Sequence, residues 1–259
     1  MNFNIFLCII LVLDIVFICF LKICNKIKPR IKFIFYNSTF IKGNQRFILI
    51  LSVIVVIRIF ILEPFYIPSN SMVPTLVSGD FIFVDKNFYG VYFPILNIKI
   101  ISNNMPCRGD VIVFKHYSGS NYVKRIIGIP GDTIQYKNNF VYVNGVPIKF
   151  YFCCYKELFG NKLKSYKEKT LGYTMYGVCK EDPCSITIAN YVDITVPQNC
   201  YFVLGDNRSN SSDSRSWGFV VSTDIIGKAS FIWMSVDVQN FIIRWCRVVM
   251  NFRRGLYVI

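Results

Sequence analysis

Residues 108–134 read RGDVIVFKHYSGSNYVKRIIGIPGDTI, and they predict the fold of the larger part of the chain. Two runs rich in Val, Ile, Phe and Tyr, at 110–116 and 122–128, are separated by Ser, Gly and Asn. Short β-branched and aromatic runs bounded by such residues are typical of strands joined by turns. The stretch therefore predicts two consecutive strands, with a third at 132–137.

The same pattern extends in both directions along the chain. Further strands are predicted at 80–86, 140–148, 201–206 and 225–235. Inside the second of these, Asn144 and Gly145 form the dipeptide that tight hairpin turns prefer. We therefore expect a mostly β domain.

Two segments depart from this pattern. Residues 150–190 are rich in Lys, Cys, Tyr and Gly without sustained periodicity, which predicts an excursion inserted into the β domain. The tail, 241–255, is basic and partly amphipathic. It predicts a helix, either at a membrane surface or packed on the domain.

Two apolar stretches near the N-terminus are candidate membrane helices. Residues 3–21 are long enough to cross a hydrocarbon core of about 30 Å, although Asp14 lies in their middle. Residues 47–62 are shorter and contain Arg58, whose side chain can reach an interface. A cleavable signal peptide is the alternative for 3–21, but a charged leading region and an A-x-A-like site are missing. We favour an anchor.

The loop at 22–46 sets the orientation of the chain in a membrane. It contains no Asp or Glu, and its basic residues are Lys22, Lys26, Lys28, Arg30, Lys32, Lys42 and Arg46. Positive loops stay on the cytoplasmic side. The sequence therefore predicts a membrane anchor at 1–62, with loop 22–46 in the cytoplasm, and an exported domain at 63–259.

Composition narrows the classes of function. The net charge of +14 suits nucleic acid or a membrane surface, but basic residues of the exported part are not clustered with aromatics, and no phosphate-binding glycine motif occurs. The single histidine, His116, has no partners spaced for a triad or a zinc site, so we expect it to be a bystander. None of the ten cysteines forms a C-x2-C pair, and Cys179 with Cys184 is the most local candidate disulfide.

Hydroxyls and amines remain as candidate catalysts. Ser69 and Ser71 lie in PSNSMVPTL, residues 68–76, bracketed by prolines directly after the second apolar stretch. A lysine can activate a serine if its amine is neutral, which requires burial to lower its pKa by several units from about 10.4. Lys124 is the best candidate because its sequence neighbours include the apolar residues Val123, Ile126, Ile127 and Ile129. The alternative is an ordinary strand lysine whose amine reaches solvent.

Three stretches together resemble, in order and spacing, the conserved boxes of type I signal peptidases, also called leader peptidases. They are PSNSMVPTLVSGDFIFVDK (68–86), the quoted 108–134 and GDNRSNSSDSRSWGFV (205–220). EPFYIPS, 63–69, is similar to the family's exit from its last anchor helix. The resemblance implies a mostly β exported catalytic domain behind one or two N-terminal transmembrane helices.

The resemblance also implies a serine endopeptidase with a Ser/Lys dyad. Ser71 matches the nucleophile that forms the acyl-enzyme, and Lys124 matches the general base. The Ser69 hydroxyl and the Ser71 main-chain N–H would form the oxyanion hole, and Ser211 would orient the lysine amine. The positions of the family's ionic scaffold match Arg125, Asp206, Asp213 and Arg215, for which we expect structural pairing.

The chain departs from the family at Asn70, where glycine is common between the two serines. Asn tolerates positive φ better than most residues, so we expect it to keep the loop geometry accessible.

The partners implied by the resemblance are secretory preproteins, bound as extended strands with small residues before the cleavage site, and membrane lipid. No cofactor, metal or nucleic acid is expected. The implied location is the bacterial inner membrane, with the catalytic domain on its outer side. The alternatives are a specialised processing peptidase of the same superfamily, an anchored β domain that binds peptides without cutting them, and a nucleic-acid-binding protein.

Overall fold

The computed structural model describes residues 50, 52–54, 57, 58, 61–92, 99–137, 140–158, 161–170, 173–179, 191–237 and 240–248. The chain divides into two units, one containing residues up to 63 with 90–102, the other containing 64–89 with 103–259. The predicted span at 3–21, loop 22–46 and most of 47–62 lie outside the described residues. Among those described, no helix has the length and apolar character needed to cross a bilayer.

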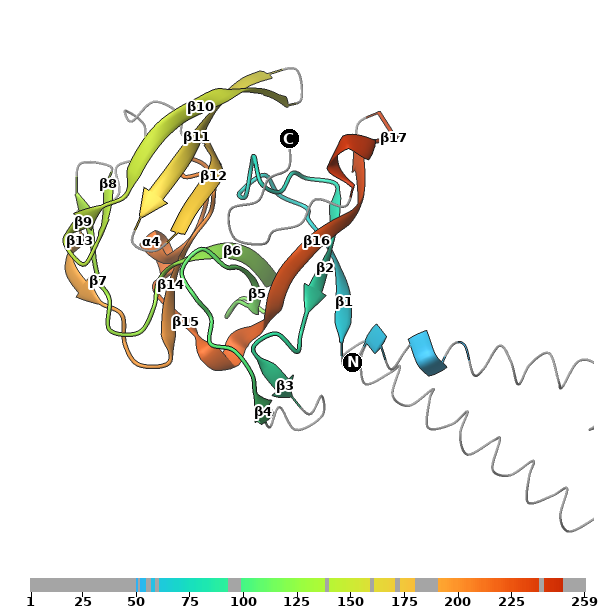
Figure 1. Cartoon of the computed structure of the whole chain (residues 1–259), viewed down its shortest axis with the longest axis horizontal. Coiled ribbons are helices and arrows are strands. Elements are labelled where there is room, and N and C mark those ends of the chain that lie inside the picture. The colour runs from blue at the N-terminus through green and yellow to red at the C-terminus, as the bar shows by residue number, and fades with distance from the viewer. Residues whose placement is uncertain are drawn as a thin grey trace, which may run out of the picture. The chain divides into compact units, whose positions relative to one another are not determined.

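The main sheet has the strand order β1-β2-β16-β5-β6-β14-β15, with β17 beside β16 (Figure 1). Its strands are β1 (Leu62–Tyr66), β2 (Asp80–Asp85), β5 (Val111–Lys115), β6 (Asn121–Gly128), β14 (Cys200–Leu204), β15 (Val220–Val221), β16 (Ile225–Asp237) and β17 (Ile242–Ile243). The long β16 pairs antiparallel with β5 through its first part and with β2 through the rest.

Three smaller sheets accompany it. A four-stranded sheet contains β13 (Tyr191–Thr195), β7 (Thr133–Lys137), β8 (Phe140–Val143) and β9 (Val146–Pro147); a three-stranded sheet contains β10 (Lys149–Leu158), β11 (Asn161–Thr170) and β12 (Tyr173–Cys179); and the first unit has a hairpin of β3 (Gly90–Tyr92) and β4 (Lys99–Ser102). The described helical turns of the second unit are α4 (Ser214–Trp217), η2 (Ser222–Asp224) and η3 (Trp245–Arg247). The expectation of a mostly β domain is confirmed.

The predicted hairpins form where the turn residues indicated. β5 and β6 pair antiparallel from Val111 with Arg125 to Lys115 with Asn121. Between β8 and β9, Asn144 and Gly145 have φ values of 52° and 75°. Two consecutive positive φ values are what a tight two-residue hairpin turn requires.

The segment predicted as an excursion has a regular structure of its own. Residues 149–158, 161–170 and 173–179 form the β10-β11-β12 sheet, in which consecutive strands pair antiparallel (Figure 1). β11 reads NKLKSYKEKT, which is mostly polar and so lacks the apolar alternation that would have predicted a strand. Residues 180–190, including Cys184 of the candidate disulfide, lie outside the described part.

The prediction of a tail helix is wrong for residues 241–248. These residues form the short strand β17 and the turn η3 instead. The backbone N–H of Arg244 donates to the Ser235 carbonyl at 2.8 Å. The Arg247 guanidinium donates to the buried Asp80 carboxylate at 2.6 Å. Pairing with β16 and an ion pair to β2 therefore override the weak amphipathic pattern.

Strands β5 and β6 are covered by apolar side chains on both faces of the sheet. On one face, Val111 and Val113 pack with the loop residues Ile67, Met72 and Leu76. On the other, a second cluster contains Tyr89, Ile112, Phe114, Ile126, Tyr201, Val203, Val220 and Ile225. Burial of alternate residues on opposite faces follows from the two-residue period of a strand.

Candidate active site

The loop that contains the two predicted serines has a fixed base and an exposed tip. Met72 and Leu76 are 1% and 0% exposed, and the Leu76 N–H donates to the Met72 carbonyl at 2.9 Å. Ser69 is exposed and Ser71 is half-buried. Their hydroxyl oxygens lie 3.3 Å apart. The two hydroxyls are therefore presented together at the surface by a segment whose apolar side chains belong to the core.

Asn70 fits this loop for a reason other than the one expected. It does not adopt a positive φ. Its Oδ1 instead accepts a hydrogen bond from the Ser78 N–H at 3.1 Å. The Ser78 hydroxyl in turn donates to the Pro68 carbonyl at 3.2 Å. The interpretation based on a left-handed backbone is therefore wrong. The Asn70 side chain instead connects the loop to the turn that precedes β2.

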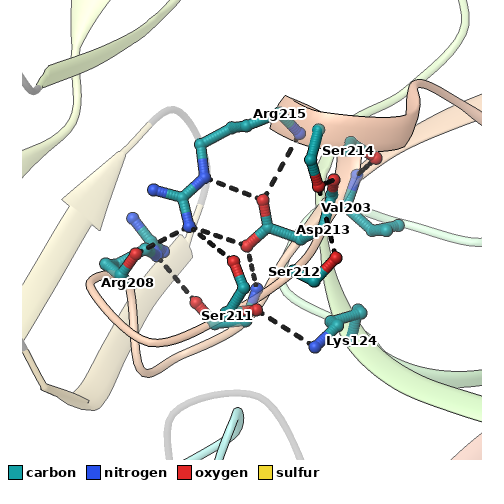
Figure 2. Close-up of polar contacts among 10 residues, drawn as sticks. Lys124, Val203, Arg208, Ser211, Ser212, Asp213, Ser214 and Arg215 are labelled. Atoms are coloured by element: carbon teal, nitrogen blue, oxygen red, sulfur yellow. Dashed lines mark hydrogen bonds and ion pairs between the residues drawn. The ribbon is translucent and has the colours of Figure 1, made fainter. Parts of the chain in front are cut away.

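Lys124 is a buried lysine in the middle of β6. Its side chain is 4% exposed, and its Nζ donates to the Ser211 hydroxyl at 3.0 Å (Figure 2). Across the ladder it pairs with Ile112 of β5. Directly opposed residues share a face of the sheet, so Lys124 lies on the side of the apolar cluster that contains Ile112 and Ile126.

This environment changes the proton affinity of the amine. Burial lowers the pKa of Lys124 from 10.5 to about 8, because a charged ammonium loses its hydration there. Asp213 and Asp206 act in the opposite direction, and Arg215 adds to the lowering. Burial prevails, so a substantial fraction of the amine is neutral near neutral pH.

The four predicted scaffold residues form two buried ion pairs. Arg125 donates to both carboxylate oxygens of Asp206, at 2.8 and 2.5 Å. Arg215 donates to both carboxylate oxygens of Asp213, at 2.7 and 2.9 Å (Figure 2). Because each carboxylate has its own bidentate arginine, neither charge is left unpaired in the interior.

The second ion pair also shapes the loop that contains Ser211. Asp213 is the N-cap of the short α4, and its Oδ2 accepts from the Gly205 N–H at 3.0 Å. Arg215 reaches back to the Arg208 carbonyl at 2.6 Å (Figure 2). Both ends of the 205–213 loop are thus held, and Ser211 is directed at Lys124.

The loop that contains Ser69 and Ser71 and the loop that contains Ser211 meet at Gly205. A Cβ on this residue would lie 2.5 Å from the Ser71 carbonyl oxygen and 2.2 Å from the Ser211 Oγ, so only glycine fits. In the described part of the chain, the hydroxyl partner of Lys124 is Ser211 and that of Ser71 is Ser69. No hydrogen bond between Ser71 and Lys124 is present among these residues.

His116 lies at the turn between β5 and β6. Its ring stacks on Tyr122 with centroids 4.3 Å apart, and its Nδ1 pairs with the Ser118 hydroxyl at 2.9 Å. Among the described residues, it has no hydrogen bond to Ser71 or Lys124. The expectation that it is a bystander stays a prediction.

The sequence comparisons agree with one another. A family model described as "Signal peptidase, peptidase S26" matches residues 40–234. A signal peptidase I of Pseudomonas aeruginosa is 39% identical over 217 residues, covering 75% of this chain and 72% of the relative. One from Buchnera aphidicola subsp. Baizongia pistaciae is 38% identical over 245 residues, covering 78% and 79%.

The chain belongs to the signal peptidase family, peptidase S26. The predicted resemblance is confirmed, and so is the predicted enzyme class, a serine endopeptidase of the signal peptidase I type. A crystal structure of a signal peptidase I from Enterococcus faecalis V583 is 29% identical and covers 48% of this chain and 97% of that one, with a TM-score of 0.30.

Two residues of this candidate site were not singled out from the sequence. Thr75, which is 2% exposed, donates its hydroxyl to Asp206 at 2.5 Å. Asn207 donates to the carbonyls of Asn70 and Ser71. Asn207 lies inside the 205–220 box and could have been noticed there, but nothing in the sequence around Thr75 marks it as a partner of a distant carboxylate.

Proposed function

We propose that this protein is a membrane-bound serine endopeptidase that removes N-terminal signal peptides from translocated preproteins, through a Ser71 acyl-enzyme with Lys124 as general base. The observation that carries the proposal is the buried Lys124 amine, with a pKa of about 8, hydrogen-bonded to Ser211. At pH 7, about one such amine in ten is neutral, against fewer than about one in a thousand for an ordinary lysine.

The reaction uses this neutral amine twice. Lys124 takes the Ser71 hydroxyl proton as the serine oxygen attacks the scissile carbonyl, and the ammonium then returns a proton to the leaving amine of the mature protein. The Ser69 hydroxyl and the Ser71 N–H stabilise the developing oxyanion. Water, activated by the same lysine, releases the signal peptide. In the free enzyme Ser71 and Lys124 are not hydrogen-bonded, and bound substrate brings them together, as catalytic contacts often tighten only in the complex.

Ser211 and the ion pairs support this chemistry without reacting. The Ser211 hydroxyl accepts a hydrogen bond from the Lys124 amine and so orients it. Arg125 with Asp206, and Asp213 with Arg215, form the structural scaffold that holds the loops around the amine.

The membrane part of the proposal rests on the sequence. Residues 1–62 form the anchor, with helices at 3–21 and 47–62 and the basic loop 22–46 in the cytoplasm. Residues 63–259 form the exported catalytic domain, with an insertion at about 150–190. The similar peptidases come from bacteria, which supports the bacterial inner membrane as the location. There the nucleophile follows the anchor directly, close to where a signal peptide emerges.

The substrates are secretory preproteins with small residues, such as Ala, at the first and third positions before the cut. Such a segment would bind as an extended strand along a sheet edge, with main-chain hydrogen bonds giving affinity and small pockets giving selectivity. Membrane lipid is the second partner.

The test is cleavage of a secretory precursor by the detergent-solubilised full chain. Wild type is compared with Ser71→Ala and Lys124→Ala, and with Lys115→Ala as a matched control, because Lys115 is an exposed lysine on the neighbouring strand. We expect the first two variants to leave the precursor intact and the control to cleave at the wild-type rate. Cleavage by Lys124→Ala at the wild-type rate would refute the dyad, and binding without cleavage by wild type would favour a peptide-binding domain.

A further inference from the structure

We infer that Asn207 is a positioning residue for the oxyanion hole, whose carboxamide orients the Ser71 main-chain N–H, an inference that rests on the proposed function. Asn207 lies in the loop after β14 and is 7% exposed. Its Nδ2 donates to the Asn70 carbonyl at 3.1 Å, and its own N–H donates to the Ser71 carbonyl at 3.0 Å. One residue therefore holds two consecutive carbonyls of the nucleophile loop.

The geometry of the peptide bond links this contact to the oxyanion donor. The Asn70 carbonyl and the Ser71 N–H belong to the same planar trans peptide group, so they point in opposite directions. When Asn207 holds that carbonyl, the Ser71 N–H must face away from Asn207. Within the described part of the chain, no group accepts a hydrogen bond from this N–H, so it is available to an oxyanion. A hydrogen bond to the carbonyl also polarises the peptide group and strengthens its N–H as a donor.

The hydrogen bond from Asn207 positions the Asn70 carbonyl relative to a second loop, which the local turn cannot do. The Val73 N–H also donates to the Asn70 carbonyl, at 3.2 Å, and a carbonyl has two lone pairs for two donors. That turn bond fixes the peptide only relative to its own loop. Asn207 fixes it relative to the 205–213 loop, which contains Ser211, the partner of Lys124. The contact thereby fixes the position of the oxyanion donor, the Ser71 N–H, relative to the general base, Lys124.

A second observation indicates that the Asn207 side chain contributes little to the stability of the fold. Its Oδ1 is buried and has no hydrogen-bond partner among the described residues. A buried acceptor without a partner reduces stability, and alanine removes this acceptor together with the Nδ2 donor. The Asn70 carbonyl keeps its hydrogen bond from the Val73 N–H, so it is not left without a partner. Substitution by alanine should therefore change activity much more than stability.

The experiment uses the full chain in detergent with a peptide substrate that has Ala directly before the cleavage site. Asn207→Ala removes the donor, and Asn207→Asp keeps the shape but directs a carboxylate oxygen at the carbonyl. The matched control is Asn104→Ala, because Asn104 is an exposed asparagine whose Nδ2 also donates to a carbonyl, that of Phe88, at 3.0 Å. The measured quantities are kcat, KM, the pH profile of kcat/KM and the thermal midpoint.

We expect kcat to fall about 10- to 100-fold in both Asn207 variants, somewhat less than the loss of about 10²–10³ that follows complete removal of an oxyanion donor. KM should stay within about threefold and the midpoint of the pH profile should not move, because neither binding nor Lys124 is altered. A peptide aldehyde, which forms a tetrahedral adduct with Ser71, should bind Asn207→Ala more weakly by the factor that kcat/KM loses. The Asn104→Ala control should match wild type.

The outcomes separate this inference from the proposed function. If both Asn207 variants keep kcat within about twofold of wild type, or raise only KM, while Ser71→Ala is inactive, Asn207 does not position the oxyanion donor and the proposed function stands. If neither Asn207 variant folds, the residue serves stability and the inference is likewise overturned. If Ser71→Ala still cleaves the substrate, the proposed function itself fails.

Discussion

Replacing Lys124 with methionine should stabilise the protein at neutral pH and destroy its activity. Methionine has a similar length and no charge to desolvate. The gap between the ordinary lysine pKa of 10.5 and the value of about 8 in the fold gives the approximate cost of keeping this lysine charged in the folded protein. Since one pKa unit corresponds to about 1.36 kcal/mol, the charged lysine lowers the free energy of unfolding by roughly 3 kcal/mol.

The pH dependence of this effect has a definite sign. At a pH between the two pKa values, an unfolded lysine is protonated while the folded one is neutral, so the unfolded state binds more protons and stability rises with pH. Below about pH 8 both states are protonated, and the full penalty of burying the charge is present. Towards pH 10.5 the penalty disappears. The methionine variant lacks this titration.

The assay is chemical denaturation of wild type and Lys124→Met in detergent, at several pH values between about 6 and 10.5. All other titrating groups are common to both proteins and cancel in the difference. We expect the variant to be more stable by roughly 3 kcal/mol at neutral pH, with the difference shrinking above about pH 8. Loss of the hydrogen bond to Ser211 shifts this difference by a constant but leaves its slope unchanged.

A difference that stays constant across this range would show that Lys124 keeps its proton in the folded protein. Lys124 could then not serve as the general base. The pH profile of wild-type kcat/KM provides an independent check. It should rise about tenfold per pH unit and level off near pH 8, because the profile reports the ionisation of the free enzyme.

Three further changes test the surroundings of the amine. Ser211→Ala should lower kcat about 10- to 100-fold with KM nearly unchanged, measured with the same peptide, because it removes the group that orients Lys124. Gly205→Ala should abolish activity and lower the thermal midpoint, since its Cβ would lie 2.2 Å from the Ser211 Oγ. Gly119→Ala has no atom within 4 Å of its Cβ, so it should keep activity, although its φ of 85° makes alanine lower the thermal midpoint as well. Equal activity of the two alanine variants would contradict the close approach of the loops. His116→Ala should retain most activity in the cleavage assay, and its complete loss would instead indicate a histidine mechanism.

The strands were predictable because turn residues and β-branched runs are local signals. The hairpin at Asn144 needed only its own dipeptide, and the structure has the two positive φ values that this dipeptide favours. β11 was not predictable, because its residues are mostly polar and its strand is defined by pairing with β10 and β12. Pairing with the strands directly before and after it in the chain leaves no apolar pattern in the strand itself.

Lys124 was selected from the sequence for neighbours that only partly explain its burial. In a strand, adjacent residues point to opposite faces, so Val123 packs in a different cluster from the face of Lys124. The apolar groups on its own face are Ile126, two residues away, and Ile112, its partner on β5. Ile112 could not be assigned to this role before the register of the hairpin was known.

The tail and Asn70 show that the partners of polar side chains could not be predicted from the sequence. Arg247 was read as part of a basic amphipathic segment, but it forms a buried ion pair with Asp80, 167 residues earlier in the chain. Asn70 was explained by backbone tolerance, but its side chain binds the Ser78 N–H. A sequence shows which residues can form charged or polar contacts, and only the fold shows which partners are near.

The two ion pairs beside Lys124 have a consequence beyond structural support. Asp213 and Asp206 each raise the pKa of the amine, and burial, with a smaller contribution from Arg215, lowers it enough to overcome them. An unpaired carboxylate in this interior would bind the ammonium far more strongly and raise the pKa of the amine further. Arg125 and Arg215 each donate to both oxygens of one carboxylate, so their positive charges offset much of the negative potential that the carboxylates produce at Lys124. The arginines thus help a site rich in carboxylates to keep the pKa of its lysine low, so that a catalytically useful fraction of the amine is neutral, as a serine–lysine mechanism requires.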